Sequence, residues 1–170
     1  PDDEEAMPEA NFLLVSDTLQ ALQTLAAAHR RRFRIPVIGI AGSNGKTVVK
    51  EWLYQLLCDD YAMVRSPRSY NSQIGVPLSV WEINEQAQLA IIEVGISKCG
   101  EMEKLEPIVQ PTVGILTNVG EAHQEGFSSL QEKCEEKLSL FRRAEAIIYD
   151  GDNPVVTESF NKMCLGTREI

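Results

Sequence analysis

The sequence predicts an α/β fold built on a mostly parallel, doubly wound sheet. Short β-branched runs alternate with helical stretches from residue 35 onward, and these runs cover 35–40, 62–65, 89–94, 113–117 and 146–149. Each run is apolar on consecutive residues, which is typical of strands covered on both faces. Strands separated by helices form right-handed βαβ units and hence a parallel sheet.

The composition supports a folded domain of ordinary size. The chain has 170 residues, of which 44% are hydrophobic and 24% charged, enough to bury a core. Its net charge of −9 excludes a generally basic surface for nucleic acid. The local basic run at 29–34 is typical of a helix C-terminus, where cations suit the helix dipole.

Cysteine usage and the chain ends predict a cytoplasmic protein. No pair among the four cysteines has metal-ligand or redox spacing, so we expect free thiols in a reducing compartment. The apolar runs are too short to cross a membrane, and the acidic start lacks the features of a signal peptide. Because the sequence has neither an initiating Met nor a terminating signal, we expect an excised piece of a longer protein.

The elements can be assigned in order along the chain. Residues 1–34 are an acidic lead-in and a linker helix, which begins near Asp17, with Gln20 in the capping position, and ends near His29. Residues 35–170 contain the predicted strands, so we expect them to form part of one α/β domain. Two further helices are expected at 47–58 and 128–143, with an apolar face on the first formed by Val48, Val49, Trp52, Leu53, Leu56 and Leu57.

The first strand leads into a P-loop, which predicts phosphate binding. The residues expected to bind the nucleotide are Ala41, Gly42, Ser43, Asn44, Gly45, Lys46 and Thr47. Glycines let backbone N–H groups turn toward a phosphate, Lys46 would reach the terminal phosphates, and Thr47 would ligate Mg²⁺. The usual pattern has Gly where this chain has Ile40, so an incidental glycine-rich turn is the alternative.

Polar residues follow the other strands at the edge of the sheet where ligands collect in such folds. Glu93 follows two isoleucines, an unusual place for a carboxylate unless it has a charged partner such as a metal; a solvated strand end is the alternative. His123 lies in a loop beyond Thr117 and would by itself be an ordinary surface residue. The run 150–153 is typical of a plain turn.

Four ordered segments together resemble the Mur ligases, the ATP-dependent amide ligases of peptidoglycan synthesis. They are Gly42-Ser43-Asn44-Gly45-Lys46-Thr47, Tyr70-Asn71-Ser72-Gln73-Ile74-Gly75-Val76-Pro77-Leu78, Ile92-Glu93-Val94-Gly95 with Gly100-Glu101-Met102, and Asn118 to His123 with Glu125-Gly126-Phe127. The sequences of these segments are most similar to those of the MurF branch, whose members join D-alanyl-D-alanine to UDP-N-acetylmuramoyl-tripeptide. Details such as Ser43 and Val48-Val49-Lys50-Glu51-Trp52 resemble MurF proteins fused to an alanine racemase, although no racemase sequence is present here.

The resemblance implies a reaction and roles for residues. ATP would phosphorylate a substrate carboxylate, and an amine would displace the phosphate from the acyl phosphate. Lys46 would stabilise the β- and γ-phosphates, Thr47 and Glu93 would hold one Mg²⁺, and His123 would help to hold a second. Asn71 would face the phosphates and the acyl substrate.

Lys137 aligns with a family lysine that is often carbamylated to support the second metal. The surrounding residues depart from the usual Lys-Gly-Glu, since the chain reads Lys137-Leu138-Ser139, so the solvated face of a charged helix is the alternative. We predict that Lys46, Lys137 and His123 take part in catalysis, and that the piece alone is inactive.

Two other functions remain open from the sequence. Folylpolyglutamate synthetases and cyanophycin-type ligases share the phosphate-binding loop and the way the metal ion is held. Their substrates would be selected mainly by residues outside this segment. A non-catalytic nucleotide-binding module would need no metal site. The pairing of Glu93 with His123 at strand ends favours an enzyme.

Overall fold

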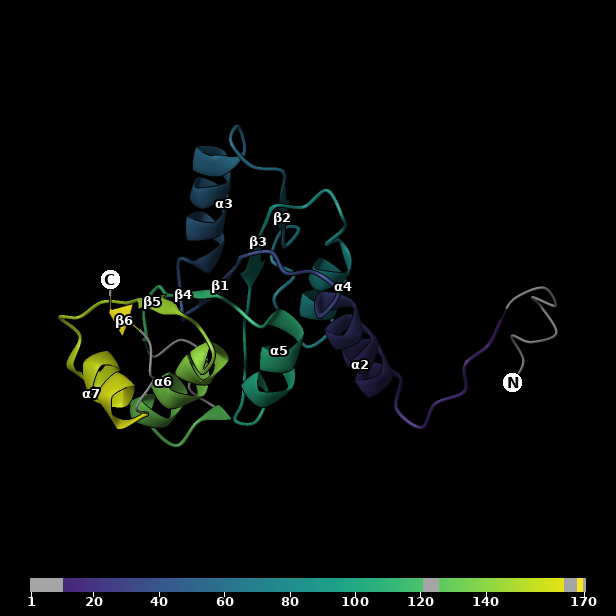
Figure 1. Cartoon of the computed structure of the whole chain (residues 1–170). Helices are drawn as coiled ribbons and strands as arrows, with labels where there is room; N and C mark the ends of the chain where they lie inside the picture. Colours follow the sequence, from purple (N-terminus) through teal and green to yellow (C-terminus); the bar gives the residue numbers. More distant parts are fainter. Residues whose placement is uncertain (1–10, 121–125, 164–167, 170) are drawn as a thin grey trace.

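The computed structural model describes residues 11–120, 126–163 and 168–169 and contains one parallel sheet with helices on both sides (Figure 1). The strand order is β2-β3-β1-β4-β5-β6, and every neighbouring pair is parallel. The strands are β1 Val37–Ala41, β2 Met63–Arg65, β3 Leu89–Glu93, β4 Val113–Leu116, β5 Ala146–Ile148 and β6 Arg168–Glu169. The doubly wound α/β prediction is confirmed, with β6 added at the edge.

The helices connect the strands in the expected alternation. They are α2 Thr18–Arg30, α3 Lys46–Leu57, α4 Gly75–Trp81, α5 Met102–Val109, α6 Leu130–Leu138, the 3₁₀ helix η2 Ser139–Phe141 and α7 Pro154–Lys162. The helix predicted at 47–58 is α3. The stretch predicted at 128–143 forms α6 and then tightens into η2.

The connections place α3 on one face of the sheet and the later helices on the other. From β1 the chain runs through α3 to β2 at one edge, whereas α4 to α7 each lead back toward β6. Right-handed crossovers in opposite directions put their helices on opposite faces. Figure 1 shows α3 above the sheet, with α5, α6 and α7 below it and α4 to the right.

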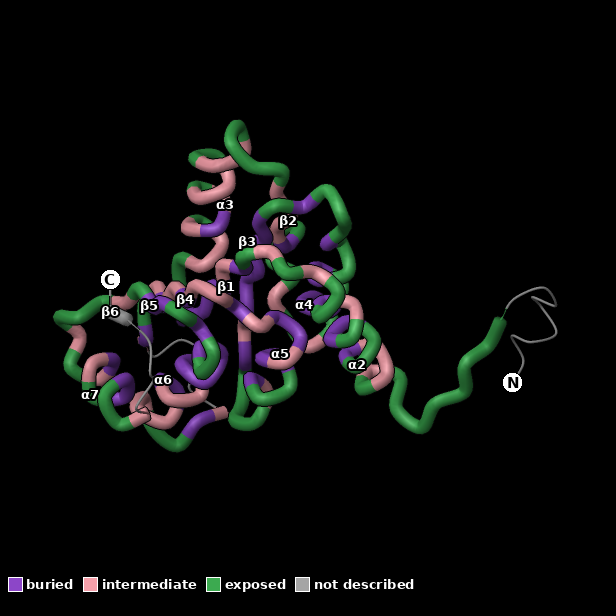
Figure 2. Tube along the Cα trace, in the orientation of Figure 1, coloured by how far each residue is buried: buried purple, intermediate pink, exposed green. Residues whose placement is uncertain are grey.

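The main core lies on the face of α4 to α7. It includes Ala41 from β1, Ile92 from β3, Leu116 from β4 and Phe141 from η2, all almost fully buried. The burial colours of Figure 2 follow this layer along the strands and the inner sides of α5 and α6. A single continuous core on this side therefore supports the strand ends at which the predicted site lies.

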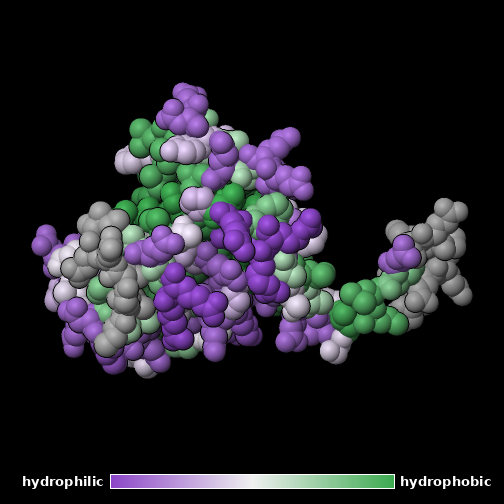
Figure 3. All heavy atoms as spheres, viewed as in Figure 1, coloured by the Kyte–Doolittle hydropathy of each residue, from purple (hydrophilic) through white to green (hydrophobic). Residues whose placement is uncertain are grey.

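The opposite face is only partly covered among the described residues. Ile40 and Ile91 are fully buried beneath α3, but Ile148 at the far end of the sheet is 45% exposed. The expected apolar face of α3 is not buried: Trp52 is 64% and Leu56 73% exposed. Figure 3 shows hydrophobic residues gathered in this region, so the apolar face that the sequence predicts for α3 remains largely uncovered among the described residues.

The lead-in helix α2 packs against α4 and α5. Gln20 N–H donates to Asp17 Oδ1 at 2.9 Å, which confirms the predicted cap. At the other end of the helix, Arg30 is 5% exposed and donates to the carbonyl oxygens of Val109 and Gln110. The basic run thus contains a helix C-terminus, as predicted, and one of its cations is buried.

Two further sequence predictions can be compared with the structure. Within the described part of the chain, no helix is both long and apolar enough to cross a bilayer. Cys58, Cys99 and Cys134 are free thiols, as expected, while Cys164 lies outside the described residues.

Candidate functional site

The loop after β1 has the backbone geometry of a phosphate cradle. Gly42 has φ +144° and Gly45 has φ +81°, conformations that L side chains rarely adopt. A Cβ on Gly42 would lie 2.0 Å from Thr117 Oγ1, so the loop also needs glycine for space. Helix α3 begins at Lys46, directly after Gly45, so its N-terminal N–H groups face the same loop.

The residues after β4 hold the loop in place. Ser43 N–H donates to the Asn118 carbonyl at 2.8 Å, and Asn44 N–H donates to Asn118 Oδ1 at 2.8 Å. Thr117 Oγ1 donates to the Asn44 carbonyl at 2.6 Å. The missing glycine at Ile40 is explained by the fold, because Ile40 is an interior residue of β1, paired with β3 and β4, and the turn starts only at Gly42.

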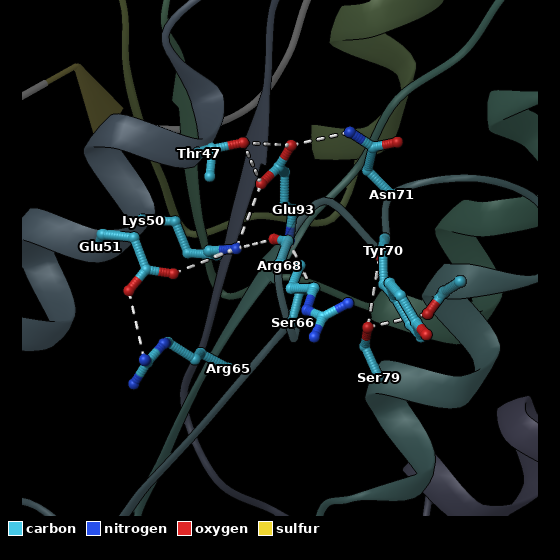
Figure 4. Close-up of polar contacts among 11 residues, drawn as sticks. Thr47, Lys50, Glu51, Arg65, Ser66, Arg68, Tyr70, Asn71, Ser79 and Glu93 are labelled. Atoms are coloured by element: carbon cyan, nitrogen blue, oxygen red, sulfur yellow. Dashed lines mark hydrogen bonds and ion pairs between the residues drawn. The ribbon is translucent and has the colours of Figure 1, made fainter.

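A buried carboxylate lies beside the first turn of α3 (Figure 4). Glu93 ends β3 and is 1% exposed. Thr47 Oγ1 lies 3.1 Å from Glu93 Oε1 and 2.9 Å from Oε2, and Asn71 Nδ2 donates to Oε1 at 2.7 Å. Lys50 Nζ lies 3.4 Å from Oε2. Glu93 is therefore a buried, partnered group, and the solvated strand end is excluded.

Three lysines converge on the other side of the loop. Lys46 Nζ donates to the Gly42 carbonyl at 3.0 Å, and Lys137 Nζ donates to the same oxygen at 3.2 Å. Lys133 Nζ donates to the Gly120 carbonyl at 2.5 Å. Both α6 lysines are almost fully buried, which excludes a solvated helix face for Lys137.

Burial lowers the pKa of all three lysines. Burial, followed by repulsion from Lys46 and Lys133, lowers the pKa of Lys137 to about 8. Burial also lowers the pKa of Lys46, against the attraction of Glu93, and that of Lys133, where repulsion from Lys46 adds to the effect. A cluster of cations with lowered pKa values is stabilised by an anion placed among them.

A cavity of about 390 Å³ connects these groups. The P-loop residues Gly42, Ser43 and Lys46 line it together with Lys137 and Asn71. Cations and loop amides therefore lie on one side of the space, while Asn71, which contacts Glu93, borders it on another side. The arrangement suits a polyphosphate with an accompanying divalent cation.

The donor set around Glu93 fits Mg²⁺ rather than a metal held by protein alone. In the described part of the chain, no group of three His, Cys, Asp or Glu side chains could hold a metal ion. Mg²⁺ usually takes one or two carboxylates and completes its shell with water and substrate phosphates. One carboxylate and one hydroxyl, Glu93 and Thr47, beside a phosphate loop match that chemistry.

The structure brings most of the predicted site residues together around the loop. Residues 41–47, Asn71, Glu93 and Lys137 border the cavity or contact residues that do. His123 lies outside the described residues, so its position relative to Glu93 is not described. The turn at 150–153 is a plain turn as predicted, in which Asp152 N–H donates to Asp150 Oδ1 at 3.1 Å.

Two buried lysines of the site were not predicted. Lys50 lies three residues after Thr47 and is the one cation in an otherwise largely apolar helical stretch, and this position could have indicated a special role. Lys133 lies one helical turn before Lys137, so both point from the same side of α6. Neither signal distinguishes a buried cation from a solvated one without the tertiary structure.

Comparisons with known proteins agree with this geometry. The model of the Mur ligase middle domain matches residues 40–165. The UDP-N-acetylmuramoyl-tripeptide–D-alanyl-D-alanine ligase of Bacillus subtilis is 34% identical over 152 residues, which are 88% of this chain and 33% of that protein. The chain thus spans about a third of the length of this relative.

Solved structures give the same result. MurF from Acinetobacter baumannii superposes with a TM-score of 0.86 at 28% identity, over 93% of this chain and 36% of that one. The MurF ligase from Thermotoga maritima, solved in complex with ADP, gives a TM-score of 0.82 at 27% identity, over 93% and 37%.

A more distant likeness concerns the fold alone. Folylpolyglutamate synthase from Mycobacterium tuberculosis gives a TM-score of 0.67 at 15% identity, over 89% of this chain and 46% of that one. The domain model, the identity to the Bacillus subtilis ligase and the higher TM-scores all agree on one family. The chain belongs to the Mur ligases, and its residues 40–165 match their middle domain.

Proposed function

We propose that this chain is the ATP-binding part of a ligase that joins D-alanyl-D-alanine to UDP-N-acetylmuramoyl-tripeptide in peptidoglycan synthesis. The proposal rests on one observation above all: the phosphate loop and Asn71 line one cavity in a Mur ligase domain, and Asn71 contacts Glu93, which pairs with Thr47 of the loop. ATP and Mg²⁺ are the cofactors we expect. The similarity to the UDP-N-acetylmuramoyl-tripeptide–D-alanyl-D-alanine ligase of Bacillus subtilis supports the choice of substrates.

The loop and its cations would act on the phosphates of ATP. Backbone N–H groups of the loop and the α3 N-terminus would bind the phosphate oxygens. Lys46 would leave the carbonyl of Gly42 and turn its ammonium toward the β- and γ-phosphates. Such positioning and charge neutralisation carry most of the catalysis in phosphoryl transfer.

Thr47 and Glu93 would hold the metal ion. Mg²⁺, when bound, would supply positive charge that neutralises the charge developing on the phosphates. Glu93 is already fixed beside the loop by Thr47 and Asn71, so its carboxylate needs little reorganisation. Asn71 would then lie between the metal ligand and the acyl substrate, where its amide can orient the carboxylate that is phosphorylated.

Lys137 has the properties that carbamylation requires. Only a neutral amine attacks CO₂, and with a pKa of about 8 roughly a tenth of the Lys137 side chains are neutral at pH 7. The carbamate would replace a cation by oxygen donors that Mg²⁺ accepts. His123 would be the further ligand of that second metal, as the family resemblance implies.

Groups outside this chain would complete the reaction. Because the chain spans about a third of the Bacillus subtilis relative, we expect the isolated 170 residues to lack turnover. A folylpolyglutamate synthetase-like ligase is the alternative, and it has the weaker support of fold likeness alone. A racemase fused to the parent protein stays a prediction from the sequence.

Phosphate release by the full-length protein tests the proposal. With Mg-ATP, release should depend on UDP-N-acetylmuramoyl-tripeptide together with D-alanyl-D-alanine, and Lys46→Ala should abolish it. Release with a folate and glutamate instead would keep the ATP site but overturn the substrates. No release with either pair would favour a nucleotide-binding module without catalysis.

A further inference from the structure

Lys50 is the residue that α3 buries most completely. The helix leaves its apolar stripe exposed, yet the Lys50 side chain has an exposure of 0%. A lysine is almost never fully buried unless its charge is paired. The proposed phosphoryl transfer gives this cation no role, so the reason for its burial lies in its contacts.

The Lys50 ammonium joins three separate elements of the fold (Figure 4). Nζ lies 3.4 Å from Oε2 of Glu93 at the end of β3 and 3.3 Å from Oε1 of Glu51 on α3 itself. It also donates to the carbonyl of Arg68, in the loop that follows β2. Arg65 at the end of β2 lies 3.2 Å from the other oxygen of Glu51, so the charges alternate outward to the surface.

The loop that Lys50 holds also supplies Asn71. Arg68 has φ +49°, an unusual conformation for a residue other than glycine, and its carbonyl accepts the Lys50 hydrogen bond. Three residues later, Asn71 N–H donates to the Ser69 carbonyl at 2.8 Å, and its side chain reaches Glu93. One ammonium therefore fixes both the carboxylate and the loop that contacts it.

The two oxygens of Glu93 have different surroundings. Oε2 faces the Lys50 cation, whereas Oε1 accepts from Asn71 on the side of the cavity. The Thr47 hydroxyl lies within 3.1 Å of both. Oε2 faces a cation, whereas the neighbours of Oε1 are the uncharged side chains of Asn71 and Thr47, so Oε1 is the oxygen better placed to accept a second cation.

We propose that Lys50 is a positioning residue that restricts Glu93 to binding a divalent cation through one oxygen, and so favours Mg²⁺ over Ca²⁺. This inference rests on the proposed Mg-nucleotide site. Mg²⁺ accepts a single carboxylate oxygen in a strict octahedral shell, while Ca²⁺ accepts both oxygens of a carboxylate in larger and more flexible shells. Releasing Oε2 would therefore help Ca²⁺ more than Mg²⁺.

The test is the affinity of the full-length protein for ADP, titrated in MgCl₂ and separately in CaCl₂. In Lys50→Met we expect the ratio of the Mg²⁺ affinity to the Ca²⁺ affinity to fall at least five-fold relative to wild type. Lys104→Met is the matched control, since Lys104 is an exposed lysine on α5, and it should leave the ratio unchanged. Circular dichroism at the titration temperature verifies that each variant is folded.

Glu51→Gln provides a second variant in case Lys50→Met does not fold. Glu51 is partly exposed, and its loss removes one anchor of Lys50 without changing Glu93. We expect the ratio to move in the same direction by about two-fold, because Lys50 is then held less firmly against Oε2.

The ratio of the two affinities distinguishes a positioning role for Lys50 from a structural or an electrostatic one. Either of the latter would change the affinities in both salts by similar factors, so an unchanged ratio in a folded Lys50→Met would overturn the inference. Failure of the proposed function gives a different result, because wild-type protein would then bind ADP in neither salt.

Discussion

Lys137 illustrates how a single residue can be unfavourable for folding and useful for chemistry. Its ammonium is almost fully buried and lies near two other lysines, with the carbonyl of Gly42 as its hydrogen-bond partner. Burial and repulsion lower its pKa to about 8. While it is protonated, such a group lowers the free energy of unfolding.

We expect Lys137→Met to raise the free energy of unfolding at pH 7 by about 1–3 kcal/mol. The unfolded chain binds the Lys137 proton more tightly than the folded one, so the penalty is complete below the folded pKa of about 8 and disappears as the pH approaches the ordinary lysine value. Urea denaturation at pH 7 and near pH 10 measures the difference. The advantage of the variant should shrink at the higher pH, and a variant less stable than wild type at pH 7 would contradict the account.

Prediction from the sequence succeeds at residues whose role follows from chain position. The loop at 42–47 was predicted from its Gly-Lys-Thr pattern after a strand, and Glu93 was singled out because parallel strands place their carboxyl ends at one edge of the sheet. Lys50 and Lys133 were not found as site residues, because helical periodicity says which face a residue occupies but not what covers it. Burial of a cation depends on partners from distant segments, here Glu93 and Gly120.

At the scale of elements, α3 differs from the amphipathic helix that its sequence suggests. The helix touches the sheet over a narrow strip centred on Lys50, and the apolar residues Val48, Trp52 and Leu56 are more than half exposed. The hydrophobic periodicity predicted the helix correctly and identified which apolar residues share one of its faces. It could not say whether another layer covers that face within these residues.

Substitutions on α3 and α5 should therefore differ in cost. Leu56→Gln should change the free energy of unfolding of this chain by less than about 0.5 kcal/mol, because the side chain is 73% exposed. Leu105→Ala on α5 should cost about 2–5 kcal/mol, since Leu105 is fully buried. Chemical denaturation of both variants measures the contrast, and equal losses would show that the stripe of α3 is buried after all.

The contact between β4 and η2 predicts a second pair of variants. A Cβ on Gly114 would lie 2.5 Å from the Phe141 ring, whereas a Cβ on Gly151 would meet nothing within 4 Å. Gly114→Ala should lower stability by about 1–3 kcal/mol through overpacking. Gly151→Ala serves as the control with little effect. Similar melting temperatures for the two variants would be inconsistent with the described packing.

At the scale of the whole molecule, α2 is part of the folded unit that holds the site. Ala26 and Ala27 belong to the same core as the strands, and Leu19 lines the cavity beside the P-loop. Sequence patterns predicted this helix and its cap but described it as a linker. Its docking depends on Arg30, whose partners lie about 80 residues away in the sequence.

Arg30→Met should be destabilising by about 1–3 kcal/mol, because the carbonyls of Val109 and Gln110 lose a buried donor. Arg31→Met removes the same charge from the neighbouring, exposed position and should change stability by less than about 0.5 kcal/mol. Thermal unfolding of the pair is the measurement. Equal behaviour of the two would mean that α2 does not depend on this contact.

The fold class could be predicted from the alternation of strands and helices, the loop from its Gly-Lys-Thr pattern, and Glu93 from its place at a strand end. Lys137, on helix α6, was predicted only through the family resemblance. The coverage of the second sheet face and the buried charge network could not be predicted, because they depend on which segments pack across the sheet. Both sets of residues build the proposed site, in which Thr47 and Glu93 would hold a metal ion that binds together with the nucleotide.

The affinity of the full-length protein for ATP, measured with and without Mg²⁺, tests this claim most directly. In wild type, Mg²⁺ should increase the affinity for ATP. In Glu93→Gln the factor of this increase should be at least ten-fold smaller, whereas Glu85→Gln, at an exposed position, is the control and should keep the wild-type factor. If folded Glu93→Gln keeps the same dependence on Mg²⁺ as wild type, the carboxylate does not hold the metal. The chain would then be a nucleotide-binding module whose buried glutamate serves only the fold.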